Sequence, residues 1–266
     1  GAQRLAGHRD TIHCVAVSND GRRALTGGDD MTVRLWDLEA IREVKPLRKT
    51  QDGSGDVEFE AYGVAFVSDR RAVSAGNANI AILWDLATGA EDGRLETGLD
   101  EVLCLSLSAD GRLLLGGAQG RLILRGAVGD KKGVPYAGHL DDVRAAAFFS
   151  DGERFVSAGG GDGQEKGRGD YAVRLWRREN LNPVELRGHE ARVNGVAVTP
   201  DGRRVLSGDA AGNLRLWDAI AGVEMLRFDK SEGGKSAISC LAISPDGAEA
   251  VTGHEDGTVR VWTLPR

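Results

Sequence analysis

Short apolar runs with the alternation typical of β-strands recur along the whole chain, and six of them share one pattern. The first reads VRLWD at residues 33–37. The matching runs are ILW at 82–84, LILR at 122–125, VRLW at 173–176, LRLWD at 214–218 and VRVW at 259–262. The tryptophan position of each run, an arginine in the third, follows the previous one after 41 to 51 residues. This period is typical of a four-stranded unit repeated around a propeller and not of a helical solenoid.

Each repeat contains three further segments that read as strands. A first apolar run, such as HCVAVS at 13–18, ends just before an Asp-Gly pair that favours a tight hairpin. A second run ends in Ser or Thr and small residues, as in ALTGG at 24–28. The tryptophan run is third, and a more polar stretch such as NPVELRG at 182–188 fits a solvent-facing edge strand. No helical periodicity interrupts the series, so the sequence predicts an all-β fold.

Two kinds of residue pair mark the repeats further. Gly-His pairs precede the first strand at 7–8, 138–139 and 188–189, and Trp-Asp pairs close the third strand at 36–37, 84–85 and 217–218. With these pairs, essentially the full chain resembles the WD40-repeat β-propeller family, and its regular Asp-Gly hairpins and high glycine content resemble bacterial members. The resemblance implies one propeller domain over residues 1–266, built from six four-stranded antiparallel blades.

The two ends of the chain complement each other. The sixth repeat stops four residues after Trp262 and lacks an outer strand, whereas AQRL at 2–5 reads as an outer strand without a blade. Pairing the two would bury both unpaired strand edges. We therefore expect the N- and C-termini to close the ring by pairing; the alternative is a seven-bladed ring with one blade outside these residues.

In the WD40 family a His, a Ser or Thr, an Asp and the Trp form a hydrogen-bonded chain inside a blade, because each buried polar group needs a partner. By this resemblance, the complete sets are His8, Thr26, Asp30 and Trp36 in the first repeat and His139, Ser157, Asp170 and Trp176 in the fourth. The partial sets are Ser74 and Trp84 in the second repeat, His189, Ser207 and Trp217 in the fifth, with Ala211 at the Asp position, and Thr252, Asp256 and Trp262 in the sixth, which lacks the His. The third repeat has Leu115, Gln119 and Arg125 and retains none.

Composition restricts the partners and the location. The net charge is −6, and acidic and basic residues are interleaved, so no polybasic segment for nucleic acid or a membrane surface is present. No apolar run approaches the roughly 18 residues of a membrane span. The cysteines, Cys14, Cys104 and Cys240, occupy a position that holds Gly or Ala in other repeats, which predicts small buried residues and fits a reducing compartment. We expect a cytoplasmic protein that binds neither nucleic acid nor membranes.

The polar residues predict neither a catalytic nor a metal centre. Three of the five histidines belong to the Gly-His pairs, and His13 and His254 have no Cys-x-x-Cys or His-x-x-x-His spacing around them. The glycine-rich segment at 159–169 precedes a strand and not the helix that a phosphate-binding loop requires, so it reads as a hairpin insertion. We expect no catalytic residues, no metal and no cofactor.

The family resemblance places the binding surface on the face with the loops before the first strands and the turns between the second and third strands. The candidate partner-binding residues are Thr11, His13, Asp29, Glu60, Tyr62, Glu101, Leu103, Asp142, Arg144, Arg192, Asn194 and Glu255, with Asn77, Ala118 and Ser239 at matching positions. The set is more acidic than the whole chain, and tyrosine and arginine are enriched in binding hot spots. We expect a non-catalytic scaffold that binds a basic protein or peptide segment around the central channel. The alternatives are an enzyme with an active site at the channel mouth and a purely structural or oligomerisation module of a larger signalling protein.

Overall fold

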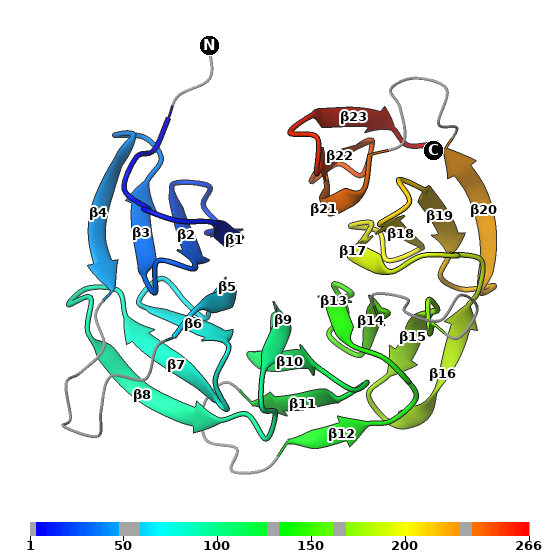
Figure 1. Ribbon diagram of the computed structural model, residues 1–266, viewed down its shortest axis with the longest axis horizontal. Coiled ribbons are helices and arrows are strands. Elements are labelled where there is room, and N and C mark those ends of the chain that lie inside the picture. The colour runs from blue at the N-terminus through cyan, green and yellow to red at the C-terminus, as the bar shows by residue number, and fades with distance from the viewer. Residues whose placement is uncertain (1–3, 48–58, 127–132, 162–168, 229–235, 266) are drawn as a thin grey trace.

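A computed structural model describes residues 4–47, 59–126, 133–161, 169–228 and 236–265. Its six antiparallel sheets stand as blades around a central channel (Figure 1). The regular elements of the described chain are all β-strands, which confirms the predicted all-β propeller of six blades. The extended linker at 48–58 and most of the hairpin insertion at 159–169 lie outside the described residues.

The strands of each blade follow chain order from the channel outwards (Figure 1). The innermost strands are β1 (Ile12–Val17), β5 (Ala61–Phe66), β9 (Val102–Leu107), β13 (Val143–Phe148), β17 (Val193–Val198) and β21 (Ile238–Ile243). The second strands are β2 (Arg23–Gly28), β6 (Arg71–Gly76), β10 (Arg112–Gly117), β14 (Arg154–Gly159), β18 (Arg204–Asp209) and β22 (Glu249–His254).

The third strands carry the tryptophan position. They are β3 (Val33–Asp37), β7 (Ile80–Asp85), β11 (Leu122–Gly126), β15 (Val173–Arg177), β19 (Leu214–Asp218) and β23 (Val259–Thr263). The outer strands are β4 (Arg42–Leu47), β8 (Glu91–Glu96), β12 (Val134–Tyr136), β16 (Asn180–Leu186) and β20 (Val223–Phe228).

The Asp-Gly pairs form the hairpins between first and second strands, as their sequence predicts. In the fifth blade, Asp201 accepts hydrogen bonds from the Thr199 hydroxyl at 2.5 Å and from the Arg203 amide at 3.0 Å. Gly202 has a φ of 67°, in the left-handed region that glycine adopts without strain. This turn fixes the register of β17 against β18, in which Val196 faces Ser207.

The hydrophobic core lies between neighbouring blades. Leu25, Val33 and Leu35 of the first blade pack with Ala61 and Val64 of the second. Equivalent positions recur in the later blades, so each of the first five blades buries one apolar face against the next. Burial at these interfaces removes branched apolar side chains from water and stabilises the ring.

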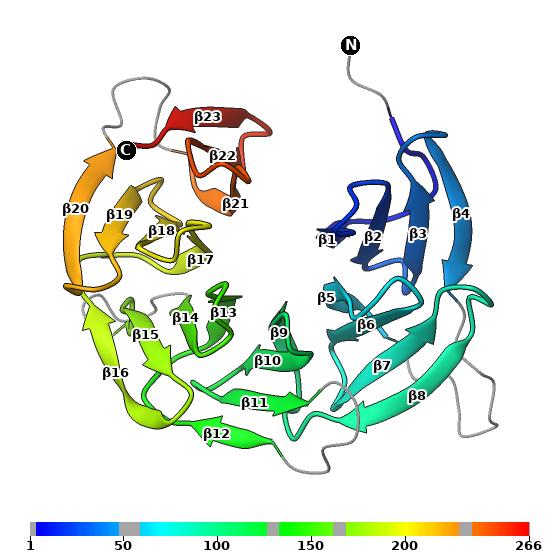
Figure 2. The ribbon, with the colours of Figure 1, turned by 180° about the vertical axis from the view of Figure 1, so that it is seen from behind.

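The ends of the chain differ from the closed arrangement expected from the sequence. The sixth sheet has three strands in the described residues, β21 to β23, and not four. Arg4 and Leu5 form no strand, and the rest of the 2–5 segment lies outside the described residues. His8, which is bonded to Thr26 and Asp30, anchors this part of the chain to the first blade. The predicted pairing of the termini is therefore wrong for the described residues, and an opening separates the first and sixth blades (Figures 1 and 2).

The cysteines show the effect of this opening. Cys104 is buried and its thiol contacts the carbonyl oxygen of Val143 in the next blade at 3.5 Å. Burial raises the thiol pKa of Cys14 and of Cys104 to about 12. Cys240, by contrast, is exposed, so the expectation of burial is wrong for this residue. It stands in the sixth blade, where no following blade covers it in the described structure.

Candidate functional site

The beginnings of the inner strands surround a cavity of about 430 Å³ at one mouth of the channel. The residues that line it are His13, Tyr62, Glu101, Leu103, Arg144, Arg192, Asn194, Ser239 and Glu255. They come from all six blades, because every inner strand begins at this end of the channel. All of them belong to the set that the sequence placed on this face.

One side of the cavity concentrates negative charge. His13 Nε2 lies 2.5 Å from Asp29 Oδ1, and the His13 ring meets the Tyr62 ring edge-on at 5.0 Å between centroids. The Tyr62 hydroxyl donates a hydrogen bond to Glu60 Oε2 at 2.5 Å. Burial raises the pKa of Tyr62, and the hydrogen bond to Glu60 and the charges of Glu60, Glu101 and Asp29 raise it further. The phenol therefore stays protonated and keeps its donor in this acidic environment.

The fourth and fifth blades place two arginines on the cavity wall. Arg144 Nη2 lies 2.9 Å from Asp142 Oδ2, so a neighbouring carboxylate partly neutralises it. Arg192 Nε donates to Asn194 Oδ1 at 2.9 Å, which orients this guanidinium. The mouth is therefore acidic beside the second and third blades and carries cationic groups beside the fourth and fifth.

The remaining candidate residues support the lining residues from behind. Asp29, Glu60 and Asp142 do not line the cavity, and they bond to His13, Tyr62 and Arg144 respectively. Asn77 accepts a hydrogen bond from the Glu60 amide at 2.9 Å. Thr11 and Ala118 do not line the cavity either, and the Thr11 carbonyl accepts the Asp29 amide at 2.9 Å.

The first blade contains the hydrogen-bonded chain expected from the sequence. His8 Nε2 lies 2.7 Å from Thr26 Oγ1 and His8 Nδ1 lies 2.9 Å from Asp30 Oδ2. The Trp36 indole donates to Thr26 Oγ1 at 2.7 Å. Burial acts to raise the pKa of Asp30, but hydrogen bonds from Thr32, a backbone amide and His8 outweigh it and lower this pKa to about 2.

The fourth blade has the same chain in a more buried setting. His139 bonds to Ser157 at 2.7 Å and to Asp170 at 3.2 Å, and Trp176 donates to Ser157 at 2.8 Å. Burial lowers the pKa of His139. Burial also acts to raise the pKa of Asp170, but hydrogen bonds from His139, a backbone amide and Arg174 reverse this and lower it.

The fifth blade completes its chain with a residue that the sequence did not indicate. His189 bonds to Ser207 at 2.6 Å, and Trp217 donates to Ser207 at 2.8 Å. Asp209 Oδ2, at the end of the strand that carries Ser207, lies 2.7 Å from His189 Nδ1. Asp209 therefore takes the role that Ala211 cannot fill. The signal in the sequence was an aspartate two residues after the serine.

The sixth blade also departs from the sequence expectation. Trp262 donates to Thr252 at 2.9 Å, and His254, two residues further along β22, bonds to the same hydroxyl at 2.8 Å. The missing histidine is thus replaced from within the strand. Asp256 does not join this chain in the described structure, because its carboxylate accepts hydrogen bonds from Thr258 at 2.6 and 2.9 Å.

The second and third blades keep less of the pattern. Trp84 donates to Ser74 at 2.9 Å, as the sequence implies. Arg125, at the tryptophan position of the third blade, is buried and donates to the backbone carbonyl of Glu96 in the second blade. A guanidinium that bonds to the neighbouring blade thus replaces the indole.

A family model described as WD domain, G-beta repeat, matches residues 2–37, 131–177, 182–218 and 227–263. The chain belongs to the WD40 family. The matched segments contain the three inner strands of the first, fourth, fifth and sixth blades, each of which has a histidine bonded to the same hydroxyl as its tryptophan.

Several curated proteins are similar to this WD40 chain. The "U3 small nucleolar RNA-associated protein 15 homolog" of Xenopus laevis is 26% identical over 80% of this chain and 39% of its own length. The "Serine-threonine kinase receptor-associated protein" of Dictyostelium discoideum is 25% identical over 80% of this chain and 68% of its own length. The "Apoptotic protease-activating factor 1" of Danio rerio is 23% identical over 82% of this chain and 16% of its own length. The chain thus spans less than half of two of these proteins. All three sources are eukaryotic, so the expected bacterial character of the repeats finds no support.

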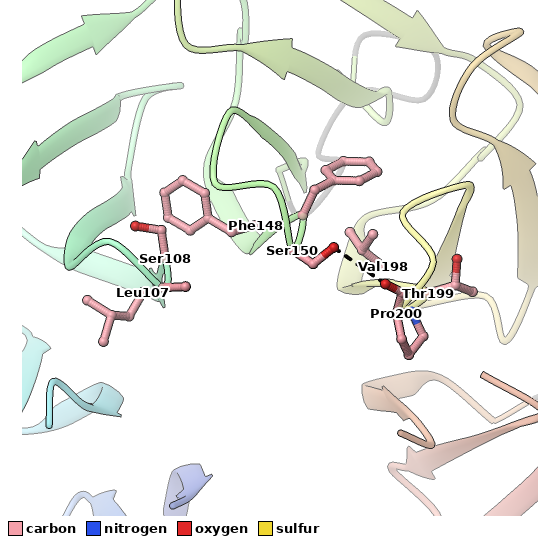
Figure 3. Close-up of a pocket in the computed structure, with 9 residues that line it drawn as sticks. Leu107, Ser108, Phe148, Ser150, Val198, Thr199 and Pro200 are labelled. Atoms are coloured by element: carbon pink, nitrogen blue, oxygen red, sulfur yellow. Dashed lines mark hydrogen bonds between the residues drawn. The ribbon is translucent and has the colours of Figure 1, made fainter. Parts of the chain in front are cut away.

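The opposite mouth of the WD40 ring holds a second cavity of about 280 Å³. It is lined by Leu107, Ser108, Ala109, Phe148, Phe149, Ser150, Val198, Thr199 and Pro200. Figure 3 shows Phe148 extending toward Ser108 and Leu107, while Ser150 Oγ donates to the Pro200 carbonyl at 3.4 Å. Its lining contains no charged side chain, so unlike the first cavity it offers no ionic contact to a charged partner.

Three further findings concern metal binding, membrane-spanning helices and catalysis. Within the described ranges, no three His, Cys, Asp or Glu side chains are grouped so that they could hold a metal ion. The same residues include no helix of the length and apolarity that crossing a bilayer requires. The matching family model describes a repeat and not a catalytic domain.

Proposed function

We propose that this WD40 protein is a non-catalytic scaffold that binds a protein or peptide segment bearing Lys or Arg, with these cations held at the acidic side of its channel mouth. The observation that carries this proposal is the cavity shared by all six blades, in which Glu101 and Glu255 accompany Tyr62. A tyrosine supplies a rigid apolar surface with a polar tip, and carboxylates around it attract cationic side chains.

The charge distribution also suggests how the segment lies. A Lys or Arg side chain would point toward Glu101, where the charges of Glu60 and Asp29 add to the negative potential. Arg192 and Arg144, on the other wall, would donate hydrogen bonds to backbone carbonyls or an acidic group of the same segment. Such a segment would cross the mouth from the third blade to the fifth.

The names of two relatives are relevant to the class of partner. One is named for its association with a kinase receptor and another for its association with a small nucleolar RNA. For this chain we favour a protein partner over RNA, because carboxylates beside the cavity repel a phosphate backbone. A cytoplasmic location fits the exposed free thiol of Cys240. Imaging of a fluorescent fusion would test that location against a nucleolar one.

The test is a charge reversal on the cavity wall. Fluorescent Lys/Arg-bearing peptides would be titrated with the wild-type protein and with the variant Glu101→Lys/Glu255→Lys, at low and high salt. We expect the wild type to bind more weakly as salt rises and the variant to lose binding by about 10-fold or more. An unchanged affinity in the variant, or a preference for single-stranded RNA over the peptides, would reject the proposed site.

The matched control is Glu179→Lys, an exposed carboxylate between β15 and β16 with no ion pair recorded in the described structure. Glu185, on the outer strand, is less suitable because it pairs with the buried Arg174 at 2.9 Å. Reversal at Glu185 would place two cations together and destabilise the fold itself.

A further inference from the structure

The outer strand of the fifth blade, β20, presents a row of apolar side chains at the rim of the ring. Val223 is 54% exposed, Met225 50% and Leu226 39%. In the described part of the chain, β20 pairs only with β19, so its other edge has no strand beside it. Such an edge directs backbone N–H and C=O groups outwards, where they can pair with a further strand.

The other outer strands carry features that disfavour pairing at their edges. β4 contains Lys45 and Pro46, β12 has three residues and includes Pro135, and β16 contains Pro183. β8 reads EDGRLE and has four charged residues. Proline, lysine, dense charge and a short strand all protect a sheet edge. β20 reads VEMLRF, with no proline, glycine or lysine and with one charge of each sign. A six-residue β-segment of this kind favours pairing between identical copies.

A bulge in β20 determines which of its side chains share a face. Glu224 pairs with Trp217 of β19, and Arg227 pairs with Arg215. Met225 is the extra residue between these pairs. Because Arg215 and Trp217 stand two residues apart on β19, Glu224 and Arg227 lie on the same face of the sheet. Arg227 Nε lies 3.4 Å from Glu224 Oε1, and the buried Arg215 also bonds to Glu224 and holds it in place.

In this register β20 is complementary to itself. Two identical antiparallel strands are related by a two-fold axis, and an axis at Leu226 places Glu224 of one copy opposite Arg227 of the other. The same register places Val223 opposite Phe228. The contact between Glu224 and Arg227 within one strand is then exchanged for two contacts between the copies. These ion pairs set the register, while backbone hydrogen bonds and the apolar side chains around Leu226 supply the affinity.

We propose that β20 is a dimerisation edge, at which a second copy of this chain adds its own β20 antiparallel to the first. The fifth sheets of the two copies then form one continuous sheet across the dimer. This association is separate from peptide binding at the channel mouth and does not depend on it.

The orientation of β20 leaves room for this contact. Figures 1 and 2 show the outer strands running along the convex rim of the ring, with β20 on the outside of the fifth blade. The two-fold axis of an antiparallel strand pair is perpendicular to the local sheet, so at the rim it runs along the direction of the channel. Two rings therefore lie side by side, and their acidic mouths face the same way.

Two other edges fit a second copy less well. β23 also ends its sheet in the described residues, but its one charged residue, Arg260, has no acidic counterpart in the strand. β16 has Val184 opposite Leu175, the position that Leu226 holds in β20, but Pro183 beside it removes a backbone N–H. Val184 is 50% exposed and therefore provides a matched control for Leu226.

Sedimentation equilibrium of the 266-residue chain over a range of concentrations tests the association. Two six-residue strands form a small interface of the transient class, so we expect a dimer that accumulates at about 100 μM. Leu226→Lys places two lysines opposite each other at the axis and should weaken dimerisation by about 10-fold or more. The control Val184→Lys should dimerise like the wild type. Urea midpoints establish that both variants remain folded.

Cross-linking tests the register directly. Cys240 is exposed, so the measurement uses a Cys240→Ser background. In this background Leu226→Cys should give a disulfide-linked dimer on mild oxidation, because the two copies of this residue face each other at the axis. Val184→Cys, in the same background, should remain mostly monomeric.

The proposal is overturned if the wild type stays monomeric over the whole range, if the dimer survives Leu226→Lys, or if Val184→Lys dissociates it equally. Cross-linking of Val184→Cys as readily as Leu226→Cys would also overturn it. Species larger than a dimer would contradict it as well, since a two-fold pairing of one edge closes at two copies.

Discussion

Asp209 and His189 lie 2.7 Å apart in the fifth blade, where they join the tryptophan and serine of that blade in one hydrogen-bonded chain. The aspartate comes from the end of β18, whereas Asp30 of the first blade comes from the turn after β2. The side chains of His189 and Asp209 are fully buried, so each residue supplies the hydrogen-bond partner that the other needs. The same interior contact is thus built from two different sequence positions.

Replacing Asp209 by alanine should destabilise the protein. It would leave the imidazole of His189 and the amide of Asn213, which also bonds to Asp209 at 2.8 Å, without this partner. The loss should be about 1–3 kcal/mol in the free energy of unfolding, measured by urea denaturation. Asp100→Ala is the control, since the Asp100 side chain is 98% exposed. Equal midpoints for the two variants would contradict the role given to Asp209.

The tryptophans should differ in their contribution according to their place in the ring. Trp176 is fully buried and contacts Tyr136 and Phe155, so Trp176→Ala should cost about 3–5 kcal/mol. Trp262 is only partly buried in the three-stranded blade, so Trp262→Ala should lower the free energy of unfolding by less than Trp176→Ala does. Denaturation midpoints of both variants test this order. A larger loss for Trp262 would mean that the sixth blade is more fully packed than the structure indicates.

Stability should fall in acid in two stages. Burial lowers the pKa values of His139 and His189 below 6.5, so in the folded state both stay neutral as the pH drops. The unfolded chain binds these protons first, and stability is lost as the pH falls below 6.5, by up to about 1.4 kcal/mol per pH unit for each histidine. Asp30, with its pKa lowered from 3.8 to about 2, adds stability that is lost below pH 3.8.

Urea midpoints measured from neutral to acidic pH test this dependence. The double variant His139→Gln/His189→Gln should be less stable at neutral pH and should lose stability less steeply in the first stage. The same slope in the variant and the wild type would show that other groups cause the acid sensitivity.

Tyr62 should matter for binding and little for folding. Tyr62→Ala removes the apolar contact surface in the cavity and should lower the affinity for a basic peptide by about 10-fold. Tyr62→Phe keeps the ring and loses the hydrogen bond to Glu60, so it should bind nearly as well as the wild type. Fluorescence anisotropy measures both, with circular dichroism as the folding control. If Tyr62→Ala binds like the wild type, the peptide does not use this side of the mouth.

Most of the fold could be predicted from the sequence, because the repeat acts locally. The alternation of apolar residues, the Asp-Gly hairpins and the spaced tryptophans specify each four-stranded unit from neighbouring segments. The same regularity made the lining residues of the cavity predictable. Every inner strand begins at the same mouth of the channel, so equivalent residues at the strand starts lie around it. His8, Thr26, Asp30 and Trp36 could be chosen by matching positions alone.

Features that depend on contacts between distant segments were decided only by the tertiary structure. Asp209 and His254 both stand two residues after the hydroxyl residue of their blade, but this spacing alone does not show that they bond, because a buried histidine or hydroxyl accepts any partner that the packed backbone brings within reach. The exposure of Cys240 and Val261 likewise has no local signature, since the same residue types are buried elsewhere in the ring. Burial at these positions depends on whether another blade lies beside them. The sequence therefore determined what each blade is, and the arrangement of the blades determined which face remains open.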